Sequence, residues 1–221
     1  MTFDKEQMKK GAMLYGIALS YLQAQQFETY CKFLLEVNEK FNLTAITNPD
    51  EVVSKHFCDS LAARLAVDFN QITSLVDIGS GPGLPGFALK IAFPHLKLTA
   101  IESIGKKAGF LKELTFKLGL TETIVINDRA ESIIKDNPEF IGSFDVATAR
   151  AVGNITMLLD YAKPYLKKYG TLLLWKSRDE VAELPSMLKQ LRRSGFELSK
   201  TYPYKIPLWQ LERFLVELIR L

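Results

Sequence analysis

Two kinds of hydrophobic pattern divide the chain near residue 70. Apolar residues recur at helical spacing over residues 4–40 and again over about 50–67, with turn-forming residues at 42–50 between them. Beyond residue 70, short apolar and β-branched runs alternate with helical stretches. We therefore expect an N-terminal helical cap over residues 1–70, packed as one unit on an α/β domain over residues 71–221.

The elements expected after residue 70 follow the order of a doubly wound sheet. Strands are expected at 74–78, 96–102, 123–127, 144–148 and 170–175, and helices at 84–93, 106–118, 155–166 and 181–193. This alternation predicts a mostly parallel, twisted sheet with right-handed crossovers. Two last strands, about 197–206 and 213–218, have no helix between them, so the last one should run antiparallel.

Composition and charge narrow the functional classes. A formal net charge of +3 over 221 residues is too small to predict wholesale nucleic-acid binding. Cys31 and Cys58 lie in apolar stretches without metal-ligand spacing, so we expect buried free thiols and no metal site. No secretory signal pattern opens the chain and no apolar run reaches about 18 residues. A cytoplasmic protein without membrane spans is therefore expected.

The loop after the first expected strand is the strongest candidate for a ligand site. It carries an acidic residue and three glycines at alternate positions, Asp77, Gly79, Gly81 and Gly83. In parallel sheets this loop commonly binds a cofactor, and glycines allow the backbone to approach it closely. Pro82 and Pro85 each remove an N–H donor that a pyrophosphate would need. S-adenosylmethionine, which has no phosphate, is the expected cofactor; an NAD-dependent oxidoreductase and a ligand-free turn are the alternatives.

Two further segments at strand ends suit a nucleoside. Glu102 ends the second strand, where its carboxylate can accept hydrogen bonds from both ribose hydroxyls or remain a solvated charge. The segment after the third strand is expected to line the adenine site; it consists of Asp128, Arg129, Ala130 and Glu131. Alternatively, Asp128 caps the next helix. The expected fold is thus a Rossmann-like class I methyltransferase, with its last strand antiparallel and an N-terminal helical cap.

Motifs spread over residues 30–176 carry a family resemblance. They are Asn42-Leu43-Thr44-Ala45, His56-x-x-Asp59-Ser60-Leu61, the loop 77–86, Glu102-Ser103-x-x-Lys106-Lys107, Arg129-Ala130-Glu131 and Arg150-Ala151. Together they resemble the bacterial ribosomal RNA small subunit methyltransferase G family, also called glucose-inhibited division protein B. One departure is Ser177, because many relatives have glycine after the lysine at position 176.

The resemblance implies N7-methylation of one guanine of 16S ribosomal RNA near the decoding centre, giving 7-methylguanosine. The implied partner is 16S ribosomal RNA or the small ribosomal subunit, and nothing in the sequence demands more than a monomer. The family's cofactor contacts would fall on five residues of this sequence, Gly79, Leu84, Ala130, Glu131 and Arg150.

The expected reaction depends on positioning, because guanine N7 offers a lone pair and needs no general base. The candidate catalytic residues are His56, Asp59, Arg150 and Lys176, with Asp59 a carboxylate close to a ring that gains positive charge. Structural alternatives are a His56–Asp59 pair on one helical face and an ion pair of Arg150 with Asp145 or Glu131. A small-molecule or protein acceptor, or a catalytically silent binding module, also stays open.

Overall fold

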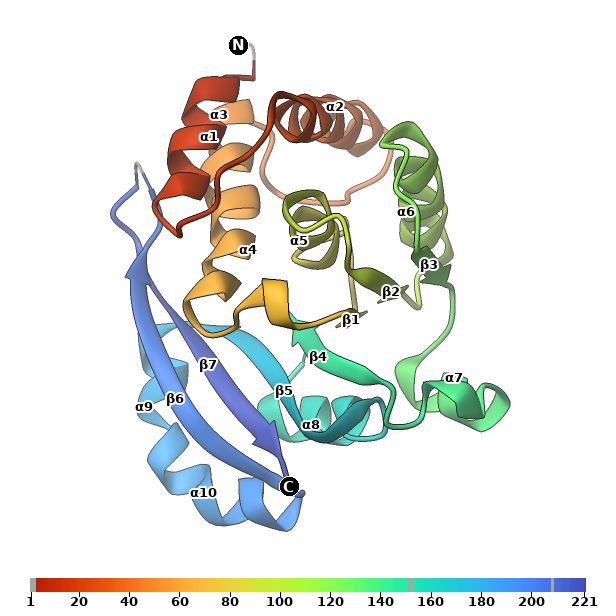
Figure 1. Cartoon of the computed structure of the whole chain (residues 1–221), viewed down its shortest axis with the longest axis vertical. Helices are drawn as coiled ribbons and strands as arrows, with labels where there is room; N and C mark the ends of the chain where they lie inside the picture. The colour runs from red at the N-terminus through yellow and green to blue at the C-terminus, as the bar shows by residue number, and fades with distance from the viewer. Residues whose placement is uncertain (1–2, 151–152, 208) are drawn as a thin grey trace.

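A single seven-stranded sheet runs through the computed structural model of the chain, which describes residues 3–150, 153–207 and 209–221 (Figure 1). Ala151 of the Arg150-Ala151 motif lies outside the described residues. The strand order is β3-β2-β1-β4-β5-β7-β6, with parallel pairing except for the two pairs that involve β7. The expected mostly parallel sheet with an antiparallel last strand is confirmed. The strands are β1 (Ser74–Ile78), β2 (Lys97–Ile101), β3 (Thr123–Ile126), β4 (Phe144–Ala149), β5 (Leu166–Lys176), β6 (Phe196–Lys205) and β7 (Glu212–Arg220).

Helices cover both faces of the sheet, so alternate residues of a strand enter different cores. On β1, Leu75 packs into one hydrophobic cluster and Val76 into the other. One face carries α1 (Lys5–Met13), α2 (Tyr21–Asn38), α5 (Gly86–Ala92) and α6 (Gly105–Lys117). The other face carries α7 (Ala130–Asp136), α8 (Ile155–Ala162), α9 (Arg178–Ala182) and α10 (Leu184–Arg193), below the sheet in Figure 1.

The segment expected as one helix over 50–67 is helical, but its geometry changes along its length. It consists of α3 (Pro49–Glu51), a π-helix η1 (Val52–Cys58), α4 (Asp59–Leu61) and a 3₁₀ turn η2 (Ala62–Leu65); another 3₁₀ turn, η3 (Phe69–Gln71), leads into β1. Within it, the hydroxyls of Ser54 and Ser60 donate to main-chain carbonyls four residues earlier, an arrangement that disturbs regular helical bonding. π-helical segments are rare and frequently lie at functional sites.

Two expected boundaries were wrong in the C-terminal half. The helix expected over 155–166 ends at Ala162, and β5 begins at Leu166 rather than at residue 170. Leu166 pairs with Phe144 and Thr171 with Val146, so residues 167–170 bulge out of the sheet and break the apolar pattern that marks a strand. The helix expected over 181–193 is two helices, because Pro185 starts a new one in the first turn of α10.

The N-terminal helices attach directly to the glycine loop. The Tyr30 hydroxyl of α2 donates to the Pro82 carbonyl at 2.5 Å, and Gly83 adopts φ +94° beside it. A Cβ at Gly83 would lie 2.6 Å from the Tyr30 hydroxyl, so glycine is required for this approach. Cys31 and Cys58 are buried free thiols, as expected. No helix among the described residues has the length and apolarity to cross a membrane.

Asp145 of β4 fastens the start of β1 to the middle of the sheet. Its Oδ2 accepts from the main-chain N–H groups of Thr73 and Ser74, both at 2.9 Å, and from the Ser74 hydroxyl. Lys167 of the bulge lies 2.5 Å from its other oxygen. Burial by itself would raise the pKa of Asp145, but these hydrogen bonds outweigh burial and hold the pKa well below its ordinary value.

We predict that Asp145→Ala lowers the free energy of unfolding at pH 7 by about 1–3 kcal/mol, because several donors lose their acceptor. Since the folded pKa is depressed, this contribution is fully present above the unfolded pKa of about 3.9 and is lost progressively as pH falls from there towards the folded pKa. Urea denaturation of both proteins between pH 7 and pH 3 measures the difference. Asp136→Ala, at an exposed carboxylate, is the control; a constant difference across this range would contradict the prediction.

Candidate active site

The buried Asp77 side chain holds the conformation of the glycine loop by accepting hydrogen bonds. The side chain is fully buried; Oδ2 accepts from the Ser80 hydroxyl (2.5 Å) and the Gly86 N–H (3.1 Å), and Oδ1 accepts from the Thr148 hydroxyl (2.8 Å). Burial raises the pKa of Asp77, while these three bonds act in the opposite direction. A Cβ on Gly86 would lie 2.8 Å from the carboxylate, so the glycine permits this contact. Both oxygens of the carboxylate thus bind protein groups, and the carboxylate ties the glycine loop to β4.

Glu102 supports the same loop from the end of β2. Its Oε2 accepts from the Gly81 N–H and its Oε1 from the Ile104 N–H, both at 2.8 Å. Each carboxylate oxygen retains a second lone pair, and Glu102 lines a cavity of about 500 Å³ together with Gly79, Gly81 and Leu84. We call this the donor cavity. Gly79 and Gly81, which adopt positive φ of +68° and +56°, have no side chain and so leave the backbone exposed to this cavity.

A smaller cavity of about 240 Å³ adjoins the donor cavity and shares Gly79 and Ser103 with it. Its lining includes the four consecutive residues that the sequence placed around an adenine, Asp128, Arg129, Ala130 and Glu131. Arg129 occupies the position before α7, and Asp128 accepts from the N–H of Arg129 at 2.6 Å. The segment and the glycine loop therefore line adjoining cavities at the carboxyl ends of the parallel strands.

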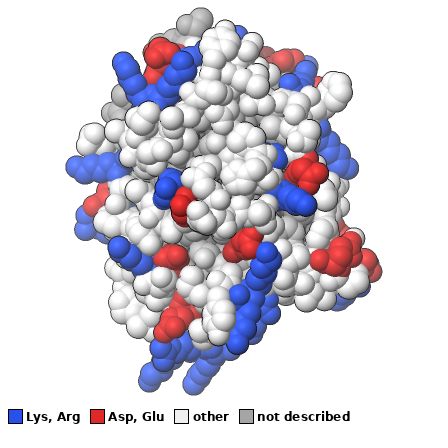
Figure 2. All heavy atoms as spheres, viewed as in Figure 1, with Lys and Arg blue, Asp and Glu red and all other residues white. Residues whose placement is uncertain are grey.

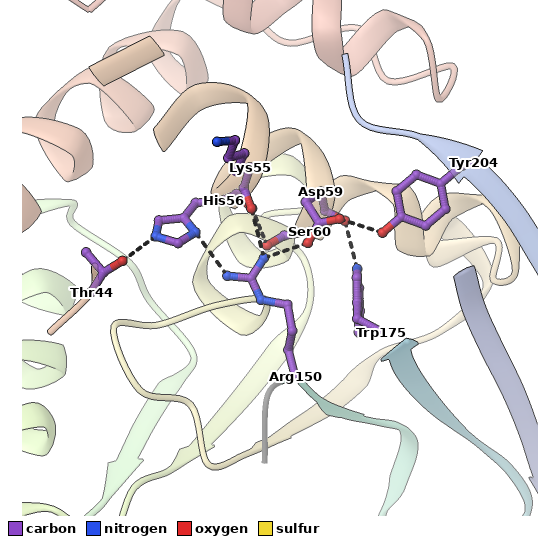
Figure 3. A network of polar contacts seen from close by, with 8 residues as sticks. All are labelled: Thr44, Lys55, His56, Asp59, Ser60, Arg150, Trp175 and Tyr204. Carbon is purple, nitrogen blue, oxygen red and sulfur yellow. Dashed lines mark hydrogen bonds and ion pairs between the residues drawn. The ribbon is translucent and has the colours of Figure 1, made fainter. Parts of the chain in front are cut away.

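Arg150 joins two candidate residues that the sequence alternative had paired with each other (Figure 3). Its Nη1 lies 2.9 Å from Asp59 Oδ2, and its Nη2 lies 3.3 Å from His56 Nδ1. Nη1 also approaches the main-chain carbonyls of Lys55 (3.5 Å) and His56 (3.4 Å). The alternative partner Asp145 instead binds Lys167. The π-helix and the end of β4 thus meet at one guanidinium.

The contacts of His56 determine its tautomer. A guanidinium can only donate, so Nδ1 is the acceptor and Nε2 carries the proton, which it donates to Thr44 Oγ1 at 2.8 Å. Thr44 Oγ1 also accepts from the Ile46 N–H at 3.1 Å. Its own hydroxyl proton remains available to the donor cavity, which Thr44 lines. Burial, and next the charge of Arg150, lower the pKa of His56 to about 3, so the imidazole is neutral at pH 7.

A third cavity, of about 350 Å³, lies on the other side of Arg150. We call it the acceptor chamber; it shares His56, Arg150 and Gly153 with the donor cavity. Lys55, Lys176 and Arg213 add positive charge to its lining, and Asp59 and Glu180 add negative charge. Two spaces, one lined by the glycine loop and one strongly polar, thus border each other at a shared wall formed by His56, Arg150 and Gly153.

Lys176 lies in this chamber although its neighbour departs from the family pattern. Its side chain is 8% exposed, and its Nζ lies 2.8 Å from Glu180 Oε1. Ser177 adopts φ −80° and ψ 170°, an extended conformation open to any residue, and caps α9 with Glu180 in a capping box. The glycine of relatives is therefore not needed for this turn.

Three residues of this region were not singled out as site residues in the sequence. Arg213 enters the chamber because β7 pairs antiparallel with β5, with Phe214 opposite Lys176. Trp175 of β5 is buried and donates from its indole N–H to the Asp59 carbonyl at 2.8 Å. Tyr204 of β6 donates to Asp59 Oδ1 at 2.5 Å. For Arg213 and Tyr204, the signal in the sequence was the expected antiparallel strand pair.

We predict that the His56 imidazole keeps its neutral Nε2–H form from pH 8 down to pH 5. The chain contains two histidines, so ¹⁵N chemical shifts resolve each ring, and a His95→Gln variant assigns the signals. Protonation of His56 with a midpoint near 6.5, the ordinary value for histidine, would contradict the buried, arginine-bound arrangement.

The sequence and fold match known proteins. Residues 23–205 match the family described as rRNA small subunit methyltransferase G. Proteins of that name from Bacillus licheniformis and Bacillus subtilis (strain 168) are 39% and 40% identical to this chain. These alignments cover 96% and 94% of this chain, and 88% and 87% of the two relatives.

The fold alone is also shared with more distant solved structures. A SAM-dependent methyltransferase from Aquifex aeolicus aligns with TM-score 0.58 and 17% identity over 85% of this chain and 98% of that protein. M. jannaschii TYW2 in complex with AdoMet aligns with TM-score 0.53 and 19% identity over 72% and 74%. From the family match and the close relatives, the chain belongs to the rRNA small subunit methyltransferase G family.

Proposed function

We propose that the protein transfers the methyl group of S-adenosylmethionine to N7 of one guanine in 16S ribosomal RNA, near the decoding centre. The observation that carries the proposal is the wall shared by the donor cavity and the acceptor chamber, made of His56, Arg150 and Gly153. A methyl donor in the first cavity and a base in the second would meet where these three residues border both cavities, which is the placement that an in-line transfer needs. The names of the close relatives support ribosomal RNA as the acceptor.

The residues around the donor cavity suit the cofactor. Glu102 has lone pairs for the ribose hydroxyls, the segment 128–131 lines the smaller cavity for adenine, and the positive φ of Gly79 and Gly81 lets backbone approach the ligand. When bound, S-adenosylmethionine supplies a methyl group on a sulfonium, and an in-line displacement leaves a neutral thioether. We propose that the Thr44 hydroxyl and Arg150, which both line the donor cavity, orient its amino-acid end.

The protonation states at the wall fit a reaction without proton transfer. Guanine N7 carries a lone pair and no hydrogen, so no base has to act, and His56 is held neutral with both nitrogens engaged. The methylated ring gains positive charge, and the carboxylates of Asp59 and Glu180 line the chamber that would receive it. Electrostatic stabilisation and positioning are therefore what these residues contribute.

The cations of the chamber favour guanine over adenine. Guanine presents the acceptor O6 beside N7, whereas adenine presents an amino donor at that position. Lys176 and Arg213 are donors only, so either one can bind O6 while leaving N7 free. We propose that they recognise the base and its phosphates, with the cap 1–70 and the domain 71–221 acting as one unit in a cytoplasmic monomer, on free RNA or on the small subunit.

The proposal is tested with labelled S-adenosylmethionine and small-subunit RNA, or subunits, from a strain lacking the gene. Chemical cleavage at 7-methylguanosine should map incorporation to one position. An RNA with 7-deazaguanosine there should accept no methyl group, because the nucleophilic nitrogen is absent. Transfer to the deaza RNA, or no transfer to any RNA or particle, would overturn the proposal.

We predict that Lys176→Gln lowers kcat/KM for the RNA about 10- to 100-fold, corresponding to about 1–3 kcal/mol for one base contact. The Kd for S-adenosylmethionine, measured by calorimetry, should change less than about 2-fold because Lys176 lines only the acceptor side. Lys189→Gln, at an exposed position on α10, is the matched control. An equal loss in the control, or a loss confined to cofactor binding, would contradict this role.

A further inference from the structure

Asp59 is a buried carboxylate with partners on both of its oxygens. It is 5% exposed; Oδ2 lies 2.9 Å from Arg150, and Oδ1 accepts from the Tyr204 hydroxyl at 2.5 Å. Its main-chain carbonyl accepts from the Trp175 indole at 2.8 Å. A buried carboxylate is stable only when its oxygens are paired, so its orientation depends on both side-chain partners. Figure 3 shows Tyr204 and Arg150 converging on it from opposite sides.

Tyr204 is well suited to fix that orientation. Burial, reinforced by the neighbouring Asp59 charge, holds the pKa of Tyr204 far above its ordinary value, so the hydroxyl stays protonated and donates. Its ring is 8% exposed and packs edge-on against Tyr15, with ring centroids 6.4 Å apart at 81°. Tyr15 follows α1, so the N-terminal helices hold the ring in place from one side.

The orientation of Asp59 in turn fixes the position of the Arg150 side chain. Its guanidinium lines the donor cavity and the acceptor chamber, and its side chain is 13% exposed. Its other contacts are a 3.3 Å bond to His56 Nδ1 and bonds of 3.4 and 3.5 Å to carbonyls, all longer than the bond to Asp59. The Asp59 carboxylate is therefore the partner that sets where the guanidinium lies.

We infer that Tyr204 is a positioning residue that orients Arg150 through Asp59, and that the C-terminal strand pair β6–β7 thereby controls the wall between the two cavities. This inference rests on the proposed function for its kinetic readout. Without the Tyr204 hydroxyl, Asp59 Oδ1 loses its donor, and the carboxylate is free to turn about its χ2 torsion. Arg150 then loses its fixed place between donor and acceptor, and the fraction of complexes in line for transfer falls.

The test uses the full chain with Tyr204→Phe, which keeps the ring and its contact with Tyr15. We expect kcat/KM for the RNA to fall about 5- to 30-fold, with Tm within about 2 °C of the unsubstituted protein. The matched control is Tyr202→Phe on the same strand, which removes a hydroxyl bonded to Glu217 at 3.1 Å and should leave kcat/KM unchanged. An unchanged rate for Tyr204→Phe, or an equal fall for Tyr202→Phe, overturns the inference.

A double-mutant cycle identifies the route. If Tyr204 acts through Arg150, adding Tyr204→Phe to Arg150→Lys should cost less than about 2-fold beyond Arg150→Lys alone. Fully multiplicative losses would show a separate role and overturn the inference.

A readout without activity separates this inference from the proposed function. In Tyr204→Phe, the ¹⁵N shift of His56 Nδ1 should change because Arg150 donates to that nitrogen, whereas Tyr202→Phe should leave it as it is. An unchanged Nδ1 shift in Tyr204→Phe overturns the inference even if methyl transfer is observed. A changed shift in a protein that methylates no RNA supports the positioning and refutes only the proposed function.

Discussion

A guanidinium and a carboxylate 2.9 Å apart, both largely shielded from water, hold the two halves of this site in register. Asp59 comes from the irregular helix before the sheet, and Arg150 comes from the end of β4, 91 residues later. Removing one partner of such a buried pair typically costs about 3–5 kcal/mol, because the other charge stays buried and unpaired. This guanidinium borders both cavities, and its charge adds to burial in keeping His56 neutral.

The glycine loop shows a division of labour within one motif. Gly79 and Gly81 open the backbone towards the donor cavity, while Asp77 and Gly86 serve the loop's own shape. Glu102 does both, since it supports Gly81 and still faces the cavity. The loop therefore combines residues that fix its conformation, above all the buried Asp77 carboxylate, with glycines that line the donor cavity.

The pattern of hydrophobic residues was enough to predict the parallel strands, because a buried strand such as β1 is a short apolar run that contains β-branched residues. It could not predict the bulge at 167–170, whose lysines and tyrosine interrupt the pattern of β5, or the π-helix, which keeps a helical spacing of apolar residues. Motifs located His56, Asp59 and Arg150. The motifs do not show which of these side chains touch. Tyr204 and Arg213 reach the site because β7 and β6 follow β5 in the sheet, which the motifs do not indicate.

The π-helix at Val52–Cys58 sets the direction in which Asp59 points relative to His56, so that both side chains reach Arg150. An α-helix turns about 100° per residue and the wider π-helix somewhat less, so one residue more or fewer in this segment would rotate Asp59 by about a quarter turn around the axis. The carboxylate would then leave Arg150 and Tyr204 together. Insertions and deletions should therefore be excluded from this stretch during divergence.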